Sequence, residues 1–153
     1  MSAVLQARSE LRPMLPTDLD AVMRIEEQIY EFPWTRGNFR DSLAAGYRCS
    51  MLLDGGRVLG YAVLIHAADE AHLLNLSIAV SSQGRGWGGR LLESEMAAAR
   101  DYGATQLFLE VRTSNIGAQR LYAKHGFDVI GMRRNYYPAR DGREDANVLS
   151  RKL

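Results

Sequence analysis

The chain of 153 residues is long enough for one domain with a sizeable core, and its 46% hydrophobic and 24% charged residues are typical of a soluble globular protein. The formal net charge of +1 gives no overall attraction to nucleic acid or to a membrane surface. The one cysteine, Cys49, excludes an internal disulfide and a multi-cysteine metal site. Residues 1–8 show no secretory layout, and no apolar run reaches the roughly 18 residues of a membrane span. We therefore expect a cytoplasmic protein with a single domain over residues 1–153.

A strand and two helices are predicted at the start of the chain. Residues 9–12 form the strand, which the following prolines end. The segment Thr17-Asp18-Leu19-Asp20 resembles a capping box, and apolar side chains at helical spacing follow it. Pro33 breaks this first helix, because a proline disfavours helical geometry in the residue before it. A second helix is expected over residues 35–45, with Gly46 as its C-terminal stop.

The middle of the chain changes to the spacing of strands. Strands are predicted over residues 47–53 and 57–66, on either side of the hairpin signal Asp54-Gly55-Gly56. A third strand is predicted over residues 71–80. A long helix over residues 87–102 follows, and the next glycine ends it.

The last third alternates strand and helix. We expect a strand over residues 106–111, a helix over residues 116–125 closed by Gly126, and strands over residues 127–132 and 146–152. A helical pair, a meander and then strand–helix–strand units predict a mixed α+β fold in three layers. Its central, mostly antiparallel sheet would have about six to seven strands, with about four helices on its two faces.

The glycine turn before the long helix is the most informative segment, and it reads Gly84-Arg85-Gly86-Trp87-Gly88-Gly89. Its backbone N–H groups are open to a ligand, because glycine has no Cβ and adopts positive φ at little steric cost. The helix that follows adds the positive end of its dipole. The turn therefore predicts an anion site, with phosphate as the best fit.

Several phosphate ligands are compatible with such a turn. It satisfies the G-x-G-x-x-G pattern of dinucleotide-binding folds, and Glu110 lies at about the right distance for a ribose-binding acid. The three antiparallel strands predicted before the turn count against that fold. A nucleoside-triphosphate loop is excluded, because Arg90 and Leu91 stand where it needs a lysine and a hydroxyl. A tight turn without a ligand stays open, although the chain entropy of four glycines counts against it.

Further motifs resemble one known superfamily. Residues 83–88 also fit Q-x-x-G-x-G, residues 109–115 read Leu-Glu-Val-Arg-Thr-Ser-Asn, and residues 121–127 read Leu-Tyr-Ala-Lys-His-Gly-Phe. Together these motifs resemble the GNAT acetyltransferases. Phe32-Pro33-Trp34 and residues 133–146 resemble in particular the RimI-type ribosomal-protein-alanine acetyltransferases, and the resemblance covers nearly the whole chain.

The sequence departs from this family at two points in the turn. Only Ser81 and Ser82 separate Val80 from Gln83, which makes the spacer about two residues shorter than in the family. Trp87 stands where a small aliphatic residue is usual.

The resemblance implies a GNAT-like fold and direct transfer of an acetyl group from acetyl-CoA, without a metal, to the N-terminal alanine amine of small-subunit ribosomal protein 18. The predicted partner is that N-terminus, with no direct contact to nucleic acid or a membrane, and the chain is expected to be a monomer or weak dimer. Alternatives are an acetyltransferase for another protein N-terminus or small amine, and a non-catalytic coenzyme A-binding module. The expected cofactor-binding residues are Ile78, Ala79, Val80, Gly84, Arg85, Gly86, Trp87, Gly88, Gly89 and Asn115.

Two side chains are candidates for proton transfer. Glu110 is a charge inside an apolar strand, where burial should raise its pKa towards the range of a useful base, unless strand alternation turns it to solvent. The resemblance points to the same residue as proton acceptor, directly or through water. Tyr122 lies two helical turns from the N-cap residue Asn115 and could protonate the departing thiolate, or it could be an aromatic anchor on the sheet. The oxyanion donor is expected to be a backbone N–H within residues 78–80.

Substrate contacts are expected from aromatic residues at both ends of the chain. Tyr136 and Tyr137 could form walls of a slot for a peptide N-terminus, and Trp34 belongs to the motif that resembles the alanine acetyltransferases. The histidines lack the spacing of metal ligands and are expected to be structural. They are His66, His72 and His125.

Overall fold

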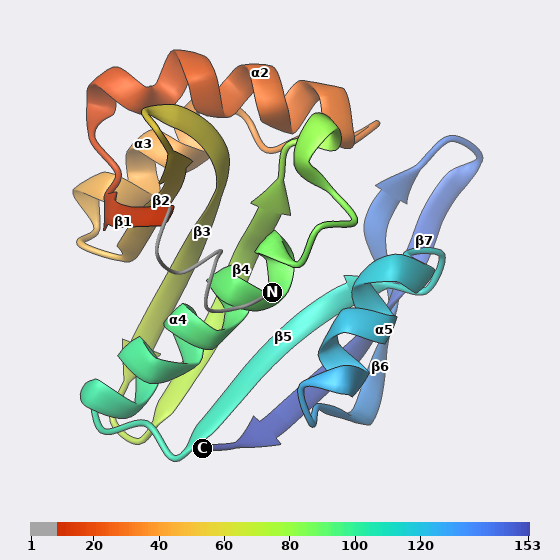
Figure 1. Cartoon of the computed structure of the whole chain (residues 1–153). Coiled ribbons are helices and arrows are strands. Elements are labelled where there is room, and N and C mark those ends of the chain that lie inside the picture. Colours follow the sequence, from red (N-terminus) through yellow and green to blue (C-terminus); the bar gives the residue numbers. More distant parts are fainter. Residues whose placement is uncertain (1–8) are drawn as a thin grey trace. The chain divides into compact units, whose positions relative to one another are not determined.

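The computed structural model describes residues 9–153, which divide into two compact units. The first unit contains residues 9–65 and 73–95, and the second contains residues 66–72 and 96–153. Seven strands follow the order β1-β2-β3-β4-β5-β7-β6, and four α-helices, α2 to α5, accompany them (Figure 1). This confirms the predicted α+β fold with a mostly antiparallel sheet. No helix in residues 9–153 is long and apolar enough to cross a membrane.

The first unit holds a three-strand meander that β4 extends. Its elements are β1 (Ser9–Pro13), a 3-10 turn (Pro16–Asp18), α2 (Leu19–Ile29), α3 (Arg36–Ala44), β2 (Arg48–Asp54), most of β3 (Arg57–Ala67) and of β4 (Glu70–Ile78), a second 3-10 turn (Val80–Ser82) and the start of α4 (Trp87–Asp101). The β1–β2 and β2–β3 pairs are antiparallel, as the hairpin signal predicts. The expected strand at the start and the two helices after it are confirmed.

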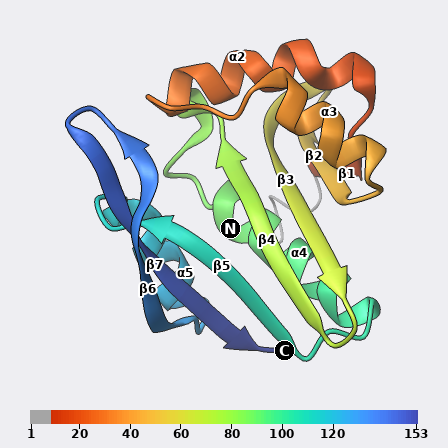
Figure 2. The same cartoon turned by 180° about the vertical axis from the view of Figure 1, so that it is seen from behind.

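Helices cover both faces of this part of the sheet. Alternate residues of β2, such as Met51, join α2 and α3 in one apolar cluster with Val22 and Phe39. On the other face, Arg48 of β2 bonds Glu95 of α4. Accordingly, α4 lies in front of β3 and β4 in Figure 1, whereas α3 lies in front of the strands in Figure 2. The predicted three layers are therefore present in the first unit.

The start of α2 differs from its prediction. The Asp18 carboxylate accepts the Leu15 N–H at 2.7 Å and pairs with Arg12 at 2.8 Å, which produces a 3-10 turn ahead of the helix. The predicted capping box with Thr17 is therefore wrong. The helix begins at Leu19, and its N-cap side chain makes no cap hydrogen bond. The ion pair with β1, which helical spacing does not reveal, decided this.

The end of β4 also differs from its prediction. The strand ends at Ile78 rather than Val80, and the chain turns through Val80–Ser82. Gly60 of β3 explains the close packing here, since a Cβ on it would lie 2.4 Å from the carbonyl oxygen of Ser77. The Ala79 N–H then donates to the Leu59 carbonyl at 2.8 Å.

The second unit is built around an antiparallel set of three strands. It contains β5 (Gln106–Arg112), α5 (Ile116–Lys124), β6 (Asp128–Ala139) and β7 (Gly142–Lys152). In sheet order β7 lies between β5 and β6 and is antiparallel to both. The helix α5 lies in front of β6 and β7 in Figure 1 and behind them in Figure 2.

The β6–β7 hairpin is longer than predicted. The expected strands over 127–132 and 146–152 extend until only Arg140 and Asp141 separate them. The register shifts between Arg133 and Tyr137, where Asn135 adopts a φ of 52°. A bulge of this kind re-aims the side chains beside it.

Candidate functional site

The predicted glycine turn has the geometry of an anion-binding helix start. Gly84 and Gly86 have φ values of 75° and 90°, which residues with a Cβ rarely adopt. The Arg90 N–H donates to the Gly86 carbonyl at 3.1 Å. The N–H groups before it, in the first turn of α4, have no acceptor within the helix. Such N–H groups and the helix dipole suit a phosphate.

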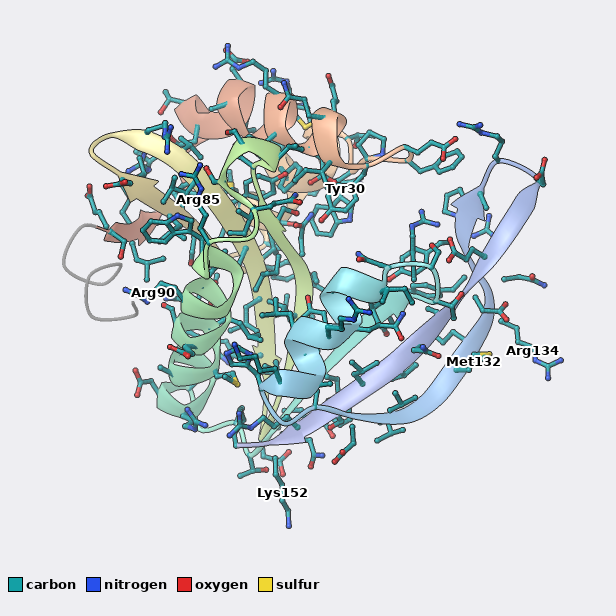
Figure 3. All side chains as sticks on the ribbon, turned by 45° about the vertical axis from the view of Figure 1, so that its right-hand side comes forward. Tyr30, Arg85, Arg90, Met132, Arg134 and Lys152 are labelled. Atoms are coloured by element: carbon teal, nitrogen blue, oxygen red, sulfur yellow. The ribbon has the colours of Figure 1, made fainter. Side chains whose placement is uncertain are left out.

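The residues around the turn hold it in place. The Gln83 side chain donates to the Ile78 carbonyl at 2.9 Å, which ties the turn to the end of β4. Trp87 is 6% exposed, so its ring is packed inside as the first residue of the helix. Arg85 is exposed beside the turn, as Figure 3 shows. The large side chain at position 87 is therefore buried in the first unit.

The early end of β4 changes the length of the connection to the glycine turn. Measured from the end of the strand at Ile78, four residues precede Gln83, two more than the two that separate Val80 from Gln83 in the sequence. Of the predicted oxyanion donors, the Ala79 N–H is already bonded to Leu59. Val80 is 53% exposed on the turn.

Glu110 lies at the centre of a charged cluster in the second unit. Its side chain is 8% exposed, so it does not face open solvent. Its Oε2 lies 2.5 Å from Nε2 of His72 at the start of β4, and its Oε1 lies 3.3 Å from Nε of Arg133 in β6. Sequence reasoning missed both partners, because they come from other strands.

The electrostatics of Glu110 reverse the expectation from its burial. Burial is the largest single influence and raises the pKa of Glu110. The hydrogen bond and charge of His72, together with the charge of Arg133, outweigh it, so the pKa lies below its ordinary value. The expected rise is therefore wrong, and the carboxylate is ionised throughout the neutral range.

Asn115 caps the start of α5 and Tyr122 lies within it, as expected. The Asn115 side chain accepts the Ala118 N–H at 3.1 Å, which confirms its role as N-cap. Tyr122 is 7% exposed, and its ring meets Phe127 edge-on at 5.6 Å between centroids. This contact makes it an anchor of the second unit, and its role as an acid stays a prediction.

The two hairpin tyrosines have different neighbours. Tyr136 is 40% exposed and meets Tyr137 edge-on at 4.9 Å, with the Arg133 guanidinium 5.4 Å from its ring centre. The Arg112 guanidinium lies 4.4 Å from the centre of the Tyr137 ring. Arg112 also donates to the Glu144 carboxylate at 3.2 Å, which links β5 to the hairpin. Arg134 projects away from β6 in Figure 3.

A buried carboxylate on α2 supports Trp34 in the first unit. Glu26 is 1% exposed and accepts hydrogen bonds from the Trp34 N–H at 2.9 Å and from Tyr61 Oη at 2.7 Å. A weaker bond of 3.3 Å comes from Asn75 of β4. Burial raises the pKa of Glu26, and its neutral donors offset only part of that rise. The Trp34 ring packs on Phe39, with 5.0 Å between centroids.

The polar network continues along β4. Ser77 Oγ bonds the Asn75 side chain at 2.7 Å and also lies 2.7 Å from Tyr30 Oη, at the end of α2 (Figure 3). It therefore connects the segment between α2 and α3 with the last residues of β4.

Each unit thus contains part of the predicted set of site residues. The first holds Trp34, residues 78–80 and the glycine turn, and the second holds Glu110, Asn115, Tyr122 and the two hairpin tyrosines. Among the described residues no cluster of His, Cys, Asp and Glu could hold a metal ion. The first unit offers an anion-binding turn, and the second offers an ionised carboxylate and a phenol.

Comparison with known proteins gives consistent matches. Residues 19–127 match the family described as Acetyltransferase (GNAT) family. The ribosomal protein bS18-alanine N-acetyltransferase of Escherichia coli K12 is 37% identical over 134 residues, covering 88% of this chain and 90% of that protein. The Haemophilus influenzae protein of the same description is 35% identical over 134 residues, covering 87% and 91%. The crystal structure of the ribosomal-protein-S18-alanine N-acetyltransferase from Escherichia coli gives a TM-score of 0.87 at 34% identity, covering 95% of this chain and 94% of that one.

Proposed function

The chain belongs to the GNAT acetyltransferase family, and we propose that it acetylates the N-terminal alanine amine of ribosomal protein bS18. It is an acetyl-CoA-dependent N-acetyltransferase. The proposed substrate rests on one observation. The chain is similar, over nearly their whole length, to relatives described as ribosomal protein bS18-alanine N-acetyltransferases. Of the segments that resemble those enzymes, Phe32-Pro33-Trp34 is hydrogen-bonded to Glu26 of α2, and the β6–β7 hairpin is joined by the bond from Arg143 to the Asn135 carbonyl.

The glycine turn is proposed to bind the pyrophosphate of acetyl-CoA. The positive φ values of Gly84 and Gly86 and the N–H groups at the start of α4 fit such an anion. The remaining cofactor contacts are proposed for residues 78–80, Trp87 and Asn115. Because the Ala79 N–H is bonded to Leu59, we propose the N–H of Val80, a residue that is 53% exposed, as the oxyanion donor within residues 78–80.

The proposed chemistry is a direct attack of the alanine amine on the thioester. An α-amino group has a pKa near 8, so about a tenth of it is neutral at pH 7. Glu110, held as a carboxylate, accepts the amine proton directly or through one water molecule as the carbon–nitrogen bond forms. The carbon–sulfur bond then breaks, and the Tyr122 hydroxyl protonates the departing thiolate. Trp34, Tyr136 and Tyr137 are proposed to contact the peptide.

A mass-spectrometric assay tests the substrate. The purified chain and acetyl-CoA are incubated with a peptide that carries the bS18 N-terminus, with an N-terminally blocked copy, and with peptides that begin with other residues. We expect acetylation of the free alanine peptide only. Product on the blocked, lysine-bearing copy would contradict N-terminal specificity. No product on any amine would favour a coenzyme A-binding module.

Tyr122→Phe tests the proposed acid. The variant keeps the aromatic contact with Phe127 and loses only the hydroxyl. We expect turnover to fall at least about tenfold, since general acid catalysis contributes about 10²–10⁴-fold. Coenzyme A affinity, measured by calorimetry, should stay nearly the same. A loss of coenzyme A binding instead would make Tyr122 a packing residue.

A further inference from the structure

We propose that His72 is the positioning residue of the Glu110 carboxylate, which it fixes from the neighbouring strand for proton transfer. The inference rests on the proposed catalytic role of Glu110. His72 is at the start of β4 and Glu110 is in β5, and both belong to the second unit. The sequence marks His72 only as a histidine without metal-ligand spacing.

The two oxygens of Glu110 are held unequally. Oε2 lies 2.5 Å from His72 Nε2, whereas Oε1 lies 3.3 Å from Arg133, whose side chain is 57% exposed. A carboxylate has about four lone-pair sites, so Oε1 keeps room for a further partner. We therefore assign Oε1 to the amine proton or the relaying water, and Oε2 to the bond that fixes the carboxylate plane.

The charges that face Glu110 come from two strands. His72 approaches from β4 and Arg133 from β6, whereas the residue opposite in β7 is the apolar Val148. Along β5 itself, the nearest charge on the same face is Arg112, which bonds the Pro138 carbonyl and Glu144. His72 thus makes the shortest bond to the carboxylate, and its side chain is half as exposed as that of Arg133, 31% against 57%.

Without His72, burial should have the larger influence on the pKa of Glu110. Burial raises the pKa of Glu110, and His72 supplies most of what opposes it. Without His72, the carboxyl would begin to take up a proton at mildly acidic pH. A protonated carboxyl cannot accept the proton of the amine, so acetylation would decline in that range.

The direct test is a titration of Glu110 by carbon-13 NMR in the protein without substrate, compared with His72→Leu and His72→Gln. We expect the inflection to move up by about one pH unit or more in His72→Leu. The move should be smaller in His72→Gln, because glutamine keeps a hydrogen-bond donor without a charge. His66→Leu is the matched control, since His66 is exposed and stacks on Tyr102. An unchanged inflection in both His72 variants would overturn the proposal, and His72→Gln alone decides if the leucine variant does not fold.

A kinetic profile supplies the second readout. Between pH 5 and 7, the logarithm of kcat/KM for the peptide should rise with a slope of about one in the wild type, because Glu110 stays ionised while the substrate amine loses its proton. In His72→Leu the slope should steepen at the acidic end of this range, with the KM for acetyl-CoA unchanged. A uniform loss at every pH would mean a merely structural role for His72. If the wild type acetylates no amine, the proposed function fails, and the NMR titration still decides whether His72 controls Glu110.

Discussion

Two carboxylates, Glu26 in the first unit and Glu110 in the second, show how partners outweigh burial. Glu26 is the more deeply buried, and all its donors are neutral, so its pKa is raised. Glu110 is also poorly exposed, but His72 and Arg133 bring positive charge, so its pKa is lowered. The charge of the donors, rather than burial, therefore decides the sign. The first carboxyl is suited to holding structure and the second to meeting an amine.

The largest expected effect is on catalysis, from Glu110→Gln. We expect kcat/KM to fall by about 10²-fold or more at pH 7, because the proposed proton acceptor is lost. The loss should shrink above pH 8, where the amine deprotonates by itself. Peptide acetylation across pH 6–9 measures this, with the exposed Glu70→Gln as control. An equal loss at every pH would argue against a base.

Glu26→Leu should mainly affect stability. It leaves the Trp34 N–H and the Tyr61 hydroxyl without their acceptor in a buried place, at about 1–3 kcal/mol for each unsatisfied group. We expect the free energy of unfolding in urea to fall by about 3 kcal/mol. Glu27→Leu, at the next and exposed position of α2, should change it by less than about 0.5 kcal/mol. Similar losses of unfolding free energy in Glu26→Leu and Glu27→Leu would contradict a stabilising role for the buried hydrogen bonds of Glu26.

Tyr61→Phe removes one of the neutral donors to Glu26 and so measures what a single hydrogen bond to this carboxyl contributes. The Glu26 oxygen then loses its 2.7 Å bond, and we expect a loss of about 1–2 kcal/mol in the free energy of unfolding. Tyr47→Phe is the control, since Tyr47 is 39% exposed. No difference between the two phenylalanine variants would show that the hydroxyl contributes nothing to the network.

The smallest effect is the pH dependence of stability, and here the two carboxyls should differ in sign. The raised pKa of Glu26 means that the folded protein binds the extra proton, so its contribution is full below about pH 4.3 and declines as pH rises through the folded value. The lowered pKa of Glu110 means that its contribution is full above about pH 4.3 and is lost as pH falls through the folded value.

Urea unfolding of the wild type, Glu26→Gln and Glu110→Gln between pH 3.5 and 7 measures both contributions. We expect the stability difference between wild type and Glu26→Gln to decrease with rising pH, and that of Glu110→Gln to increase. Two differences that change in the same direction would contradict the opposite pKa shifts.

Local motifs predicted much of the fold and the first outline of the site. Thr35 and Asn115 are N-caps, and Gly84 and Gly86 have positive φ, because capping and glycine geometry depend on neighbours in the chain. The capping box at Thr17 failed because Asp18 pairs with Arg12 of β1. The strand end at Ile78 was equally hidden, since the last residues of β4 pack closely against Gly60 of a different strand, β3.

Consecutive residues were enough to assign the family, the glycine turn and Glu110 as the charge in an apolar strand. The electrostatic state of that carboxylate and the support of Trp34 by Glu26 depend instead on tertiary contacts. Burial was predictable from the strand pattern, but its competitors His72 and Arg133 come from β4 and β6. A pKa depends on charges within a few ångströms, and a sequence does not show which distant residues come that close.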